Sequence, residues 1–391
     1  MASIRKRTWI TPDGTERQAW QCDYRDAAGK RRSKQFARKK DADAFATKAG
    51  YEVSQGVHTP DRESITVEQA GKNWLARGER EDLEPSTLAM YDQHLRLHIV
   101  PFLGAKRLNQ LTKPMIEDYR DTLLDSGRSR AITRKILGSL SSLVKEAQRK
   151  GFVAQNVAED VTAKRSSRDK VKVVPPSKEH MRSLLAAAAK ARPMDEPLLL
   201  VLIFAGLRAS EVRALPWSNV DLKRGLITVD RRADYKNVIG PPKSAAGRRT
   251  IPVGPKVIQA LKKWKLRCPT SDADLVFPSE KGTPIFHNNL YLFFQEKLQI
   301  EAGICRPKLK DGEPVVDGEG NAVMEGLYGL HDFRHAAASL WIAQRVDAKR
   351  VSTWMGHSSI QITFDTYGHL FAELEDDAAV VAALEAGVLG T

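Results

Sequence analysis

The sequence has little of what secreted, membrane-spanning or metal-binding proteins require. Its 391 residues include three cysteines, Cys22, Cys268 and Cys305, which lie far apart and show no paired spacing for disulfides or for a metal. No run of about 18 apolar residues occurs, and the N-terminus carries Arg and Lys without the apolar stretch of a signal peptide. We therefore expect a protein of the cytoplasm with reduced thiols and no membrane contact.

Negative charge is also scarce. The chain has 62 Lys and Arg against 48 Asp and Glu, which gives a formal net charge of +14. Such an excess favours a polyanionic partner such as nucleic acid. The length of 391 residues predicts two or three domains, with enough material for real hydrophobic cores.

The N-terminal segment predicts a small basic domain. Alternating residues broken by Gly-containing turns predict antiparallel strands at 3–10, 17–25 and 31–36, and a helix is expected from Lys39 to about Gln55. A basic sheet of this size can enter a DNA major groove, although the same charges would also suit a solvated surface. The candidate DNA contacts in this domain are Lys30, Arg31, Arg32 and Lys34.

The chain from Thr66 to Lys150 is typical of an all-helical domain. Apolar residues recur at helical spacing, and prolines mark the start of two of the expected helices. Exposed cations on these helices would face a duplex, and Arg130 and Arg134 are the candidate contacts. Residues 161–176 have the composition of a basic linker whose charge suits lying across phosphates, with Lys164 and Arg165 as further candidates.

Reactive side chains gather between Gly329 and Tyr367. His331, Arg334 and His335 have the i, i+3, i+4 spacing that places them on one face of a helix. His357 follows a glycine that marks a helix end, and Tyr367 offers a phenol in a short polar and aromatic segment.

This combination of side chains points to phosphate chemistry. Tyrosine attacks well only when its proton is removed and the charge developing on its target is neutralised. Arginine suits the second task, because its planar fork matches two phosphate oxygens and stays charged at any working pH. A second arginine, Arg208, lies upstream between Gly206 and Glu211. The set therefore suggests phosphoryl transfer through a covalent tyrosyl intermediate.

At these residues the chain resembles the tyrosine recombinases, and most closely the integrases of phages and mobile elements. Any one matching segment is a weak signal, whereas five in the family's order make chance a poor explanation. The segments cover the C-terminal half of the chain. They are Gly206 to Glu211, Pro242 to Ser244 with Arg249 to Pro252, Leu330 to His335, Met355 to Ser358, and Tyr367.

The resemblance implies a multidomain fold. Residues 1–60 would form an arm-type DNA-binding domain of a three-stranded sheet plus a helix. Residues 61–160 would form an all-α core-binding domain, one jaw of a clamp around DNA. The basic linker at 161–176 would lead to a catalytic domain at 177–391 of mixed α+β structure, mainly α. Its amphipathic C-terminal tail would dock into a neighbouring protomer.

The resemblance also implies roles for the reactive residues. Tyr367 would attack the phosphodiester and give a 3′-phosphotyrosine and a free 5′-hydroxyl. Arg208 and Arg334 would clamp the non-bridging oxygens, and His357 would donate a further hydrogen bond. Lys243, in a turn between two strands, would protonate the leaving oxygen.

Several of these roles have competitors. His331 is the preferred general base for the phenol, yet His335 follows the arginine directly, and only the resemblance decides which of the two meets the phosphate. We expect His335→Ala to keep more cleavage activity than His331→Ala. Glu211 supports the site by holding Arg208 or a neighbouring group, unless it merely solvates a helix start. The other candidates for the general acid are Lys236, Arg248 and Arg249.

The predicted function is site-specific recombination that integrates a phage or another mobile element. The expected partner is double-stranded DNA at core attachment sites and arm sites, bound by a homotetramer in the bacterial cytoplasm. Because the tyrosyl ester conserves bond energy, neither a metal nor a nucleotide cofactor is expected, and no Gly-rich phosphate loop or carboxylate pair suggests otherwise.

A directionality factor or a host DNA-bending protein would complete the machinery, for instance in excision. Two other interpretations stay open: a type IB-like enzyme that relaxes DNA without sequence preference, and a DNA-binding regulator that has lost catalysis.

Overall fold

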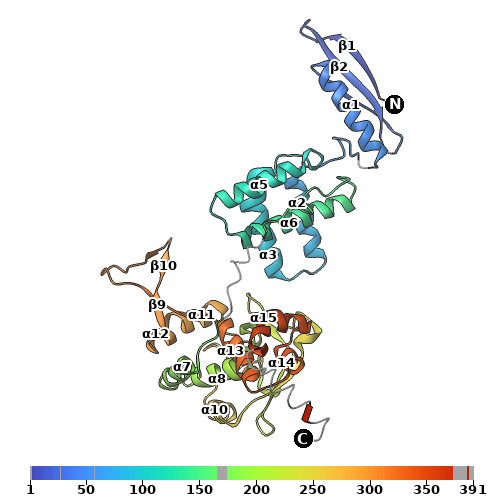
Figure 1. The fold of residues 1–391 in the computed structure, drawn as a ribbon. Coiled ribbons are helices and arrows are strands. Elements are labelled where there is room, and N and C mark those ends of the chain that lie inside the picture. Colours follow the sequence, from blue (N-terminus) through green and yellow to red (C-terminus); the bar gives the residue numbers. More distant parts are fainter. Residues whose placement is uncertain are drawn as a thin grey trace. The chain divides into compact units, whose positions relative to one another are not determined.

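The chain forms two compact units. The computed structural model describes residues 2–26, 28–56, 58–164, 174–310, 312–372 and 385–386. The units are Met1–Lys170 and Val171–Thr391 (Figure 1). Within the described ranges, no helix is both long enough and apolar enough to span a membrane.

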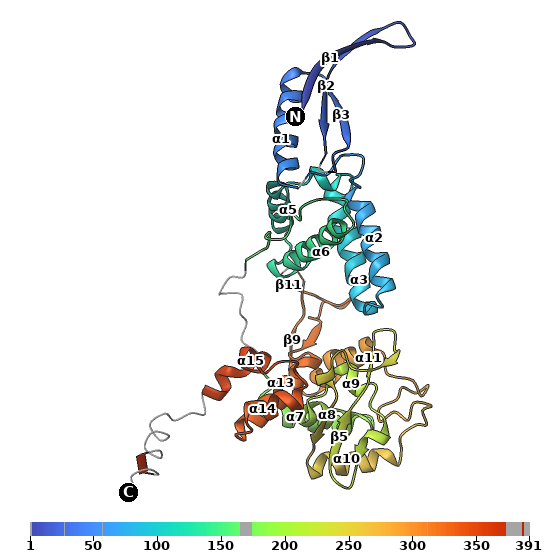
Figure 2. The ribbon, with the colours of Figure 1, turned by 90° about the vertical axis from the view of Figure 1, so that its right-hand side faces the viewer.

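The first unit begins with a three-stranded antiparallel sheet and a helix packed on it. The strands β1 (Ser3–Ile10), β2 (Glu16–Arg25) and β3 (Arg31–Phe36) pair in the order β1-β2-β3, and α1 (Lys39–Ser54) contacts chiefly β2. Figure 2 shows α1 running alongside the sheet. Phe45 of α1 lies against the rings of Tyr24 and Phe36 on the buried side. The strands and the helix predicted for this segment are confirmed.

The rest of the first unit is a helical bundle. Its elements are α2 (Val67–Arg80), α3 (Pro85–His94), the π-helical turn η1 (Leu95–Ile99), α4 (Val100–Leu103), the 3-10 turn η2 (Leu108–Gln110), α5 (Lys113–Asp125) and α6 (Arg130–Arg149). The side chains of Thr66, Thr112 and Ser129 accept hydrogen bonds from the first turns of α2, α5 and α6, which is why these helices begin where they do. The apolar faces of the helices enclose one core around Trp74 and Leu140.

The second unit is built around α8 (Asp195–Ala205), whose side chains are almost all buried. The helices α7 (Lys178–Lys190), α10 (Pro255–Lys265) and α13 (Leu330–Ala343) pack on it. A small antiparallel sheet has the order β4-β5-β8, and Ile227 pairs with Ile251 inside the same core. Its strands are β4 (Val220–Asp221), β5 (Leu226–Val229) and β8 (Arg249–Pro252).

Short elements connect these layers. They are α9 (Ala209–Val212), η4 (Trp217–Asn219), β6 (Arg232–Ala233), β7 (Ile239–Gly240), η5 (Ala245–Gly247), α11 (His287–Leu292), η6 (Phe293–Leu298), α12 (Gln299–Glu301), β9 (Cys305–Pro307), β10 (Leu309–Lys310), β11 (Glu313–Pro314) and β12 (Met324–Gly326). The polar segment from Cys305 to Gly326 forms two small antiparallel pairs, in which β9 pairs with β12 and β10 pairs with β11.

The described C-terminal part of the second unit consists of α14 (Ala348–Met355) and α15 (Ile360–Ala372), which pack on each other and on α13 (Figures 1 and 2). Tyr367 therefore lies in a helix, where the sequence indicated only a short polar and aromatic segment. The segment contains Gly368 and several β-branched residues, which are poor helix formers, so packing of its buried side has overridden local propensity. The amphipathic tail predicted after Glu373 lies almost entirely outside the described residues.

Candidate active site

The close approach of α8 to α13 brings Arg208 to the site. Gly206 ends α8 in the left-handed conformation with φ +59°, as helix-ending glycines commonly do. A Cβ on Gly206 would lie 2.9 Å from Cβ of Ala337 and 3.2 Å from the ring of Trp341, so a side chain would push α13 away. Arg208, two residues on, is the N-cap residue of α9, and its side chain is about one third exposed.

Glu211 binds two arginines from different parts of the chain. Its buried carboxylate accepts hydrogen bonds from Nη1 of Arg208 at 2.7 Å and from Nη1 and Nη2 of Arg249 at 3.0 and 2.8 Å. Burial acts to raise the pKa of Glu211, but the hydrogen bonds and charge of Arg249, together with Arg208, lower it to about 2. Glu211 is thus an anion that holds Arg208, in line with the sequence-based interpretation.

Arg334 lies on α13 with only 2% of its surface exposed. It donates from Nη1 to the carbonyl oxygen of Gly206 at 2.7 Å and from Nη2 to that of Met355. Burial and then the charge of Arg208 lower the pKa of Arg334 to about 9. The guanidinium therefore stays protonated at neutral pH.

The end of α14 positions His357. Gly356 ends this helix in the left-handed conformation with φ +62°. Nδ1 of His357 lies 2.9 Å from the hydroxyl of Thr363, a fully buried residue of α15. Burial, followed by the charges of Arg334 and Arg208, lowers the pKa of His357 to about 4. The ring is therefore neutral, and its orientation is set through Nδ1.

Tyr367 is 2% exposed and lies against an imidazole. Its hydroxyl oxygen is 2.6 Å from Nδ1 of His335, so the phenol donates to this nitrogen when the ring carries its own proton on Nε2. Burial raises the pKa of Tyr367 to about 12, and burial followed by the neighbouring His331 lowers the pKa of His335 to about 4. A neutral phenol and a neutral proton acceptor thus face each other.

His331 lies one turn before His335 on the same face of α13. Their ring centroids are 4.7 Å apart. Burial of part of the ring and then the charges of Arg334 and Arg208 lower the pKa of His331. The sequence favoured His331 as the partner of the phenol, whereas the hydrogen bond to Tyr367 belongs to His335. Helical spacing puts both rings on one wall, and it cannot tell which ring meets a residue of another helix.

Lys243 lies exposed in the loop between β7 and β8, which includes η5. The two ends of this loop pack tightly on each other, since a Cβ on Gly247 would lie 2.5 Å from Cβ of Pro242. Of the other candidates for the general acid, Arg248 is exposed, and Lys236 lies 5.7 Å from the ring centre of Tyr235. Arg249 is instead buried and bound to Glu211. Its role in organising the site was missed, as was that of Thr363.

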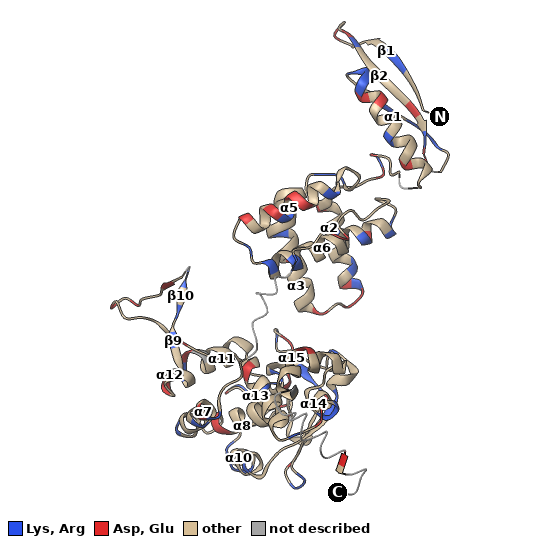
Figure 3. Cartoon of the chain, in the orientation of Figure 1, with Lys and Arg blue, Asp and Glu red and all other residues tan. Residues whose placement is uncertain are grey.

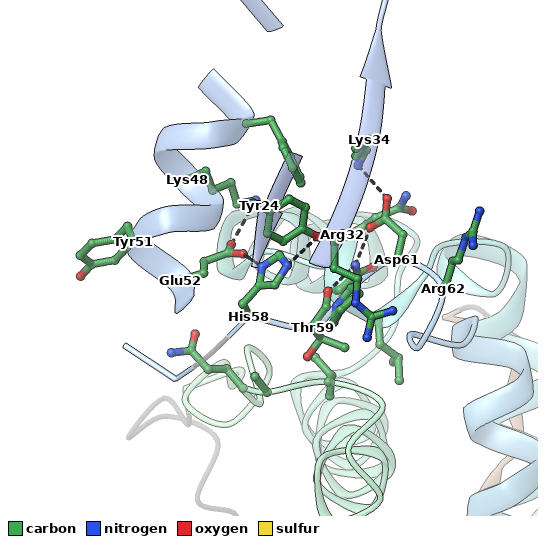
Figure 4. Close-up of a pocket in the computed structure, with 18 of the residues that line it drawn as sticks. Tyr24, Arg32, Lys34, Lys48, Tyr51, Glu52, His58, Thr59, Asp61 and Arg62 are labelled. Carbon is green, nitrogen blue, oxygen red and sulfur yellow. Dashed lines mark hydrogen bonds and ion pairs between the residues drawn. The ribbon is translucent and has the colours of Figure 1, made fainter. Parts of the chain in front are cut away.

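The candidate DNA contacts at 30–34, in β3 and just before it, divide into two kinds. Lys30 and Arg31 are exposed, and the side chain of Arg31 is 70% exposed beside Asp23. Arg32 binds Asp26 at 2.7 Å and also Glu63. Nζ of Lys34 binds Asp61 at 2.7 Å (Figure 4). Figure 3 shows both basic and acidic residues on the sheet and α1. Arg32 and Lys34 therefore join the sheet to the segment after α1.

The remaining candidate DNA contacts also include both exposed cations and cations with partners in the chain. Arg130 is exposed at the start of α6, and Lys164 is exposed at the end of the described part of the first unit. Arg134 donates from Nε and Nη2 to the carbonyl oxygen of Ala163, at 3.1 and 3.0 Å, so it holds the chain where it leaves the bundle. Arg165 lies outside the described residues.

A helical fold that gathers a buried tyrosine, a neutral imidazole and two arginines defines a class: the tyrosine recombinases. The chain belongs to the phage integrase family. Residues 177–373 match the Phage integrase family, and residues 66–124 match the N-terminal SAM-like domain of phage integrases.

Relatives of known sequence agree with this membership. The chain is 24% identical to the ICEBs1 integrase of Bacillus subtilis (strain 168) over 307 residues, which cover 76% of this chain and 77% of the relative. It is 23% identical to a tyrosine recombinase XerC-like protein of Caldanaerobacter subterraneus subsp. tengcongensis over 385 residues, covering 90% and 92%. The protein is therefore a site-specific recombinase of the tyrosine type, and neither the DNA-relaxing enzyme nor the silent regulator is favoured.

Solved structures confirm the fold. The Tn1549 transposon integrase in complex with a circular intermediate DNA matches with a TM-score of 0.66 at 18% identity, covering 82% of this chain and 99% of that one. A lambda integrase tetramer bound to a Holliday junction matches with a TM-score of 0.58 at 18% identity, covering 90% and 95%. The expected multidomain fold, with a small sheet before mainly helical domains, is confirmed.

Proposed function

We propose that Tyr367 is the nucleophile with which this recombinase cuts and rejoins double-stranded DNA. The observation that carries the proposal is the 2.6 Å contact between the phenol and His335, beside the buried Arg334. The phenol oxygen forms a bond to phosphorus as the bond to the 5′ oxygen breaks, which leaves a 3′-phosphotyrosine. The 5′-hydroxyl of another strand then reverses the step, so the bond energy is conserved.

The proton of the phenol goes to His335. A general base must lie within hydrogen-bond reach of the proton that it takes, and His335 meets this condition. Its lowered pKa keeps it neutral and able to accept at neutral pH. This assignment replaces the sequence-based preference for His331, which is left to contact the phosphate or its surroundings. Lys243 supplies a proton to the departing 5′ oxygen.

The charge that develops on phosphate meets three donors. Arg208, Arg334 and His357 bind the non-bridging oxygens, and removing one such preorganised donor is expected to cost about 10²–10³ in cleavage rate. The carbonyls bound to Arg334 use one N–H of Nη1 and one of Nη2, and the second N–H of each nitrogen is left for phosphate. Glu211 keeps Arg208 in place.

The domains divide DNA recognition among them. We assign residues 1–60 to arm sites, residues 61–160 to the core site, residues 161–176 to a basic linker and residues 177–391 to catalysis. The exposed cations Lys30, Arg31, Arg130 and Lys164 are the first candidates for phosphate contact. Arg32, Lys34 and Arg134 already have partners within the chain, so they are expected to act mainly through the fold.

The assembly proposed for strand exchange is a homotetramer on DNA, as in the lambda integrase tetramer bound to a Holliday junction. The substrate is the attachment site of a phage or another mobile element, as the relation to the ICEBs1 and Tn1549 integrases suggests. A directionality factor or a host DNA-bending protein would set the direction of the reaction. The bacterial cytoplasm is the compartment in which such DNA is found.

The decisive experiment uses nicked DNA from the element's own attachment site, which traps the covalent complex. Wild-type protein should give a slower, protease-sensitive band on a denaturing gel, and Tyr367→Phe should give none while it binds DNA equally well in a native gel. Phenylalanine keeps the ring that packs in the site and removes the hydroxyl. A covalent band formed by Tyr367→Phe would falsify the assignment of the nucleophile.

A further inference from the structure

Arg249 is a buried cation whose hydrogen bonds reach three separate segments. Its side chain is 1% exposed. Nη1 and Nη2 bind the carboxylate of Glu211, and Nη1 also donates to the carbonyl oxygen of Gly247 at 3.0 Å. Nε donates to the carbonyl oxygen of Trp354 at 2.6 Å. A guanidinium enclosed in this way does not face a DNA phosphate.

Each of the three segments carries a group of the proposed chemistry. Glu211 holds Arg208, Gly247 belongs to the loop that bears Lys243, and Trp354 lies just before His357. The segments are far apart in sequence, so their relative placement depends on tertiary contacts. Arg249 bonds to all three at once.

The end of α14 shows why an arginine is suited to this position. The last carbonyl groups of a helix lack partners within the helix and carry its negative dipole end. Here the carbonyl oxygens of Trp354, Met355 and Gly356 accept hydrogen bonds from Arg249, Arg334 and Arg208 respectively. Two of these arginines are proposed to bind phosphate. The third, Arg249, binds the same helix end but is not proposed to bind phosphate.

Packing around Gly356 leaves little freedom for this arrangement. A Cβ on Gly356 would lie 2.9 Å from the carbonyl oxygen of Ala246, 3.0 Å from Cδ of Arg249 and 3.1 Å from its Nη1. The Lys243 loop, Arg249 and the end of α14 are therefore in direct contact. A shift of Arg249 would be passed to the loop on one side and to His357 on the other.

We propose that Arg249 is a positioning residue for strand cleavage, which sets Lys243, Arg208 and His357 relative to one another without touching DNA. The inference rests on the proposed function. Displacing a reacting group by about 1 Å can cost about 10²-fold in rate. We therefore expect Arg249→Met to bind core-site DNA with wild-type affinity and to cleave it about 10²-fold more slowly at saturating enzyme.

A modified DNA substrate tests whether Arg249 acts through Lys243. Replacing the 5′ bridging oxygen by sulfur makes the leaving group a thiolate, which departs with its electron pair and needs no proton, since a thiol has a pKa of about 8.5. Relative to wild type, the loss of cleavage rate in Arg249→Met should be at least about tenfold smaller on this substrate than on the oxygen substrate. The reason is that the departing sulfur needs no proton from Lys243. Arg249→Lys, which keeps a cation beside Glu211 and is expected to fold, should show the same preference to a smaller degree.

Control variants separate the possible failures. Arg77→Met removes an arginine, itself 29% exposed, from the buried Glu146 of the first unit and should leave the ratio of sulfur to oxygen cleavage unchanged. Lys243→Ala should recover on the sulfur substrate, and its failure to do so would count against the general-acid assignment alone. The saturating cleavage rate then decides the role of Arg249.

Two results would overturn the positioning role of Arg249. One is wild-type cleavage of both substrates by Arg249→Lys. The other is a loss in Arg249→Met and Arg249→Lys that follows the fraction of folded or DNA-binding protein, with the same ratio of sulfur to oxygen cleavage as wild type. Thermal unfolding and native gels supply the folded and DNA-binding fractions for each variant.

Discussion

The hydroxyl of Tyr367 and Nδ1 of His335 form the central contact at the scale of single residues. Burial raises the pKa of the phenol to about 12 and lowers that of the imidazole to about 4, so the resting pair is neutral. A phosphate bound by Arg208 and Arg334 would favour transfer of the proton, because negative charge then passes from the phenol to a group held by two cations. We therefore expect Tyr367, the proposed nucleophile, to stay protonated until DNA is bound.

We predict that His335→Ala cleaves DNA about 10²–10⁴-fold more slowly than wild type, which is typical of a lost general base. His331→Ala should lose less activity. This order is opposite to the one expected from sequence. The measurement is covalent-complex formation on a nicked core site under single-turnover conditions. His335→Asn is a useful control, because an amide can bond to the phenol but cannot take its proton. A greater loss in His331→Ala would return the base role to that residue.

The imidazoles of His335 and His357 also make stability depend on pH. The pKa values of His335 and His357 are about 4 in the folded protein, against a usual value near 6.5 in an unfolded chain. Between these values the unfolded chain binds more protons, so the contribution is complete above pH 6.5 and is lost as the pH falls towards 4. Thermal unfolding should show a lower Tm at pH 5 than at pH 7. The double variant His335→Gln with His357→Gln should lose less Tm over the same interval, and an equal loss would contradict the prediction.

At the scale of elements, the segment between α1 and α2 joins the sheet to the helical bundle. His58 lies between Glu52 and the hydroxyl of Tyr24, each 2.9 Å away, and Asp61 binds Lys34 (Figure 4). Asp61 also accepts from Nδ2 of Asn109, a residue of η2 in the bundle, at 2.7 Å. DNA contact by Lys34 stays a prediction, and its ion pair with Asp61 also makes it part of this connection.

Asp61→Asn is predicted to loosen this connection. Burial acts to raise the pKa of Asp61, yet Lys34 and Asn109 lower it, so the carboxylate is stabilised as an anion. The pair is partly exposed, and its loss should cost about 0.5–1 kcal/mol. Hydrogen exchange of residues 58–64 should become faster, while Asp121→Asn, which removes an exposed carboxylate paired with the adjacent Arg120, should not change it. Unchanged exchange in Asp61→Asn would refute the role of Asp61.

At the scale of the whole molecule, the two units of the chain have different proposed roles. The two units have separate cores, and the proposed catalytic residues all belong to the second unit. The chain has 62 basic and 48 acidic residues, but many of its cations take part in internal ion pairs such as Arg32 with Asp26. Net charge therefore indicates a polyanionic partner without identifying the residues that touch it.

Deletion of residues 1–60 is predicted to spare cleavage of core sites and to reduce integration. The core of the helical bundle begins after this boundary, so the truncated protein keeps its bundle and its catalytic residues. Cleavage of an isolated core site and integration into a plasmid with complete arm sites measure the two activities separately. Equal integration by the truncated and full-length proteins would sink the proposed arm-binding role.

The sequence by itself determined the family and most of the elements, although not the helix that carries Tyr367. Period-two alternation predicts β1 to β3, and N-cap residues such as Thr66 and Ser129 mark helix starts, because these signals depend on near neighbours in the chain. The order of Arg208, Lys243, Arg334, His357 and Tyr367 suffices for the family, since residue type and spacing carry that information.

Tertiary structure decided which of these residues meet. His335 reaches Tyr367 across 32 residues of sequence, Arg249 reaches Glu211 across 38, and Arg208 reaches the carbonyl of Gly356 across 148. Such contacts depend on how helices pack, which no local pattern encodes. The pKa of Tyr367 likewise follows from burial against other elements, since the same phenol in an exposed chain would have an ordinary pKa near 10.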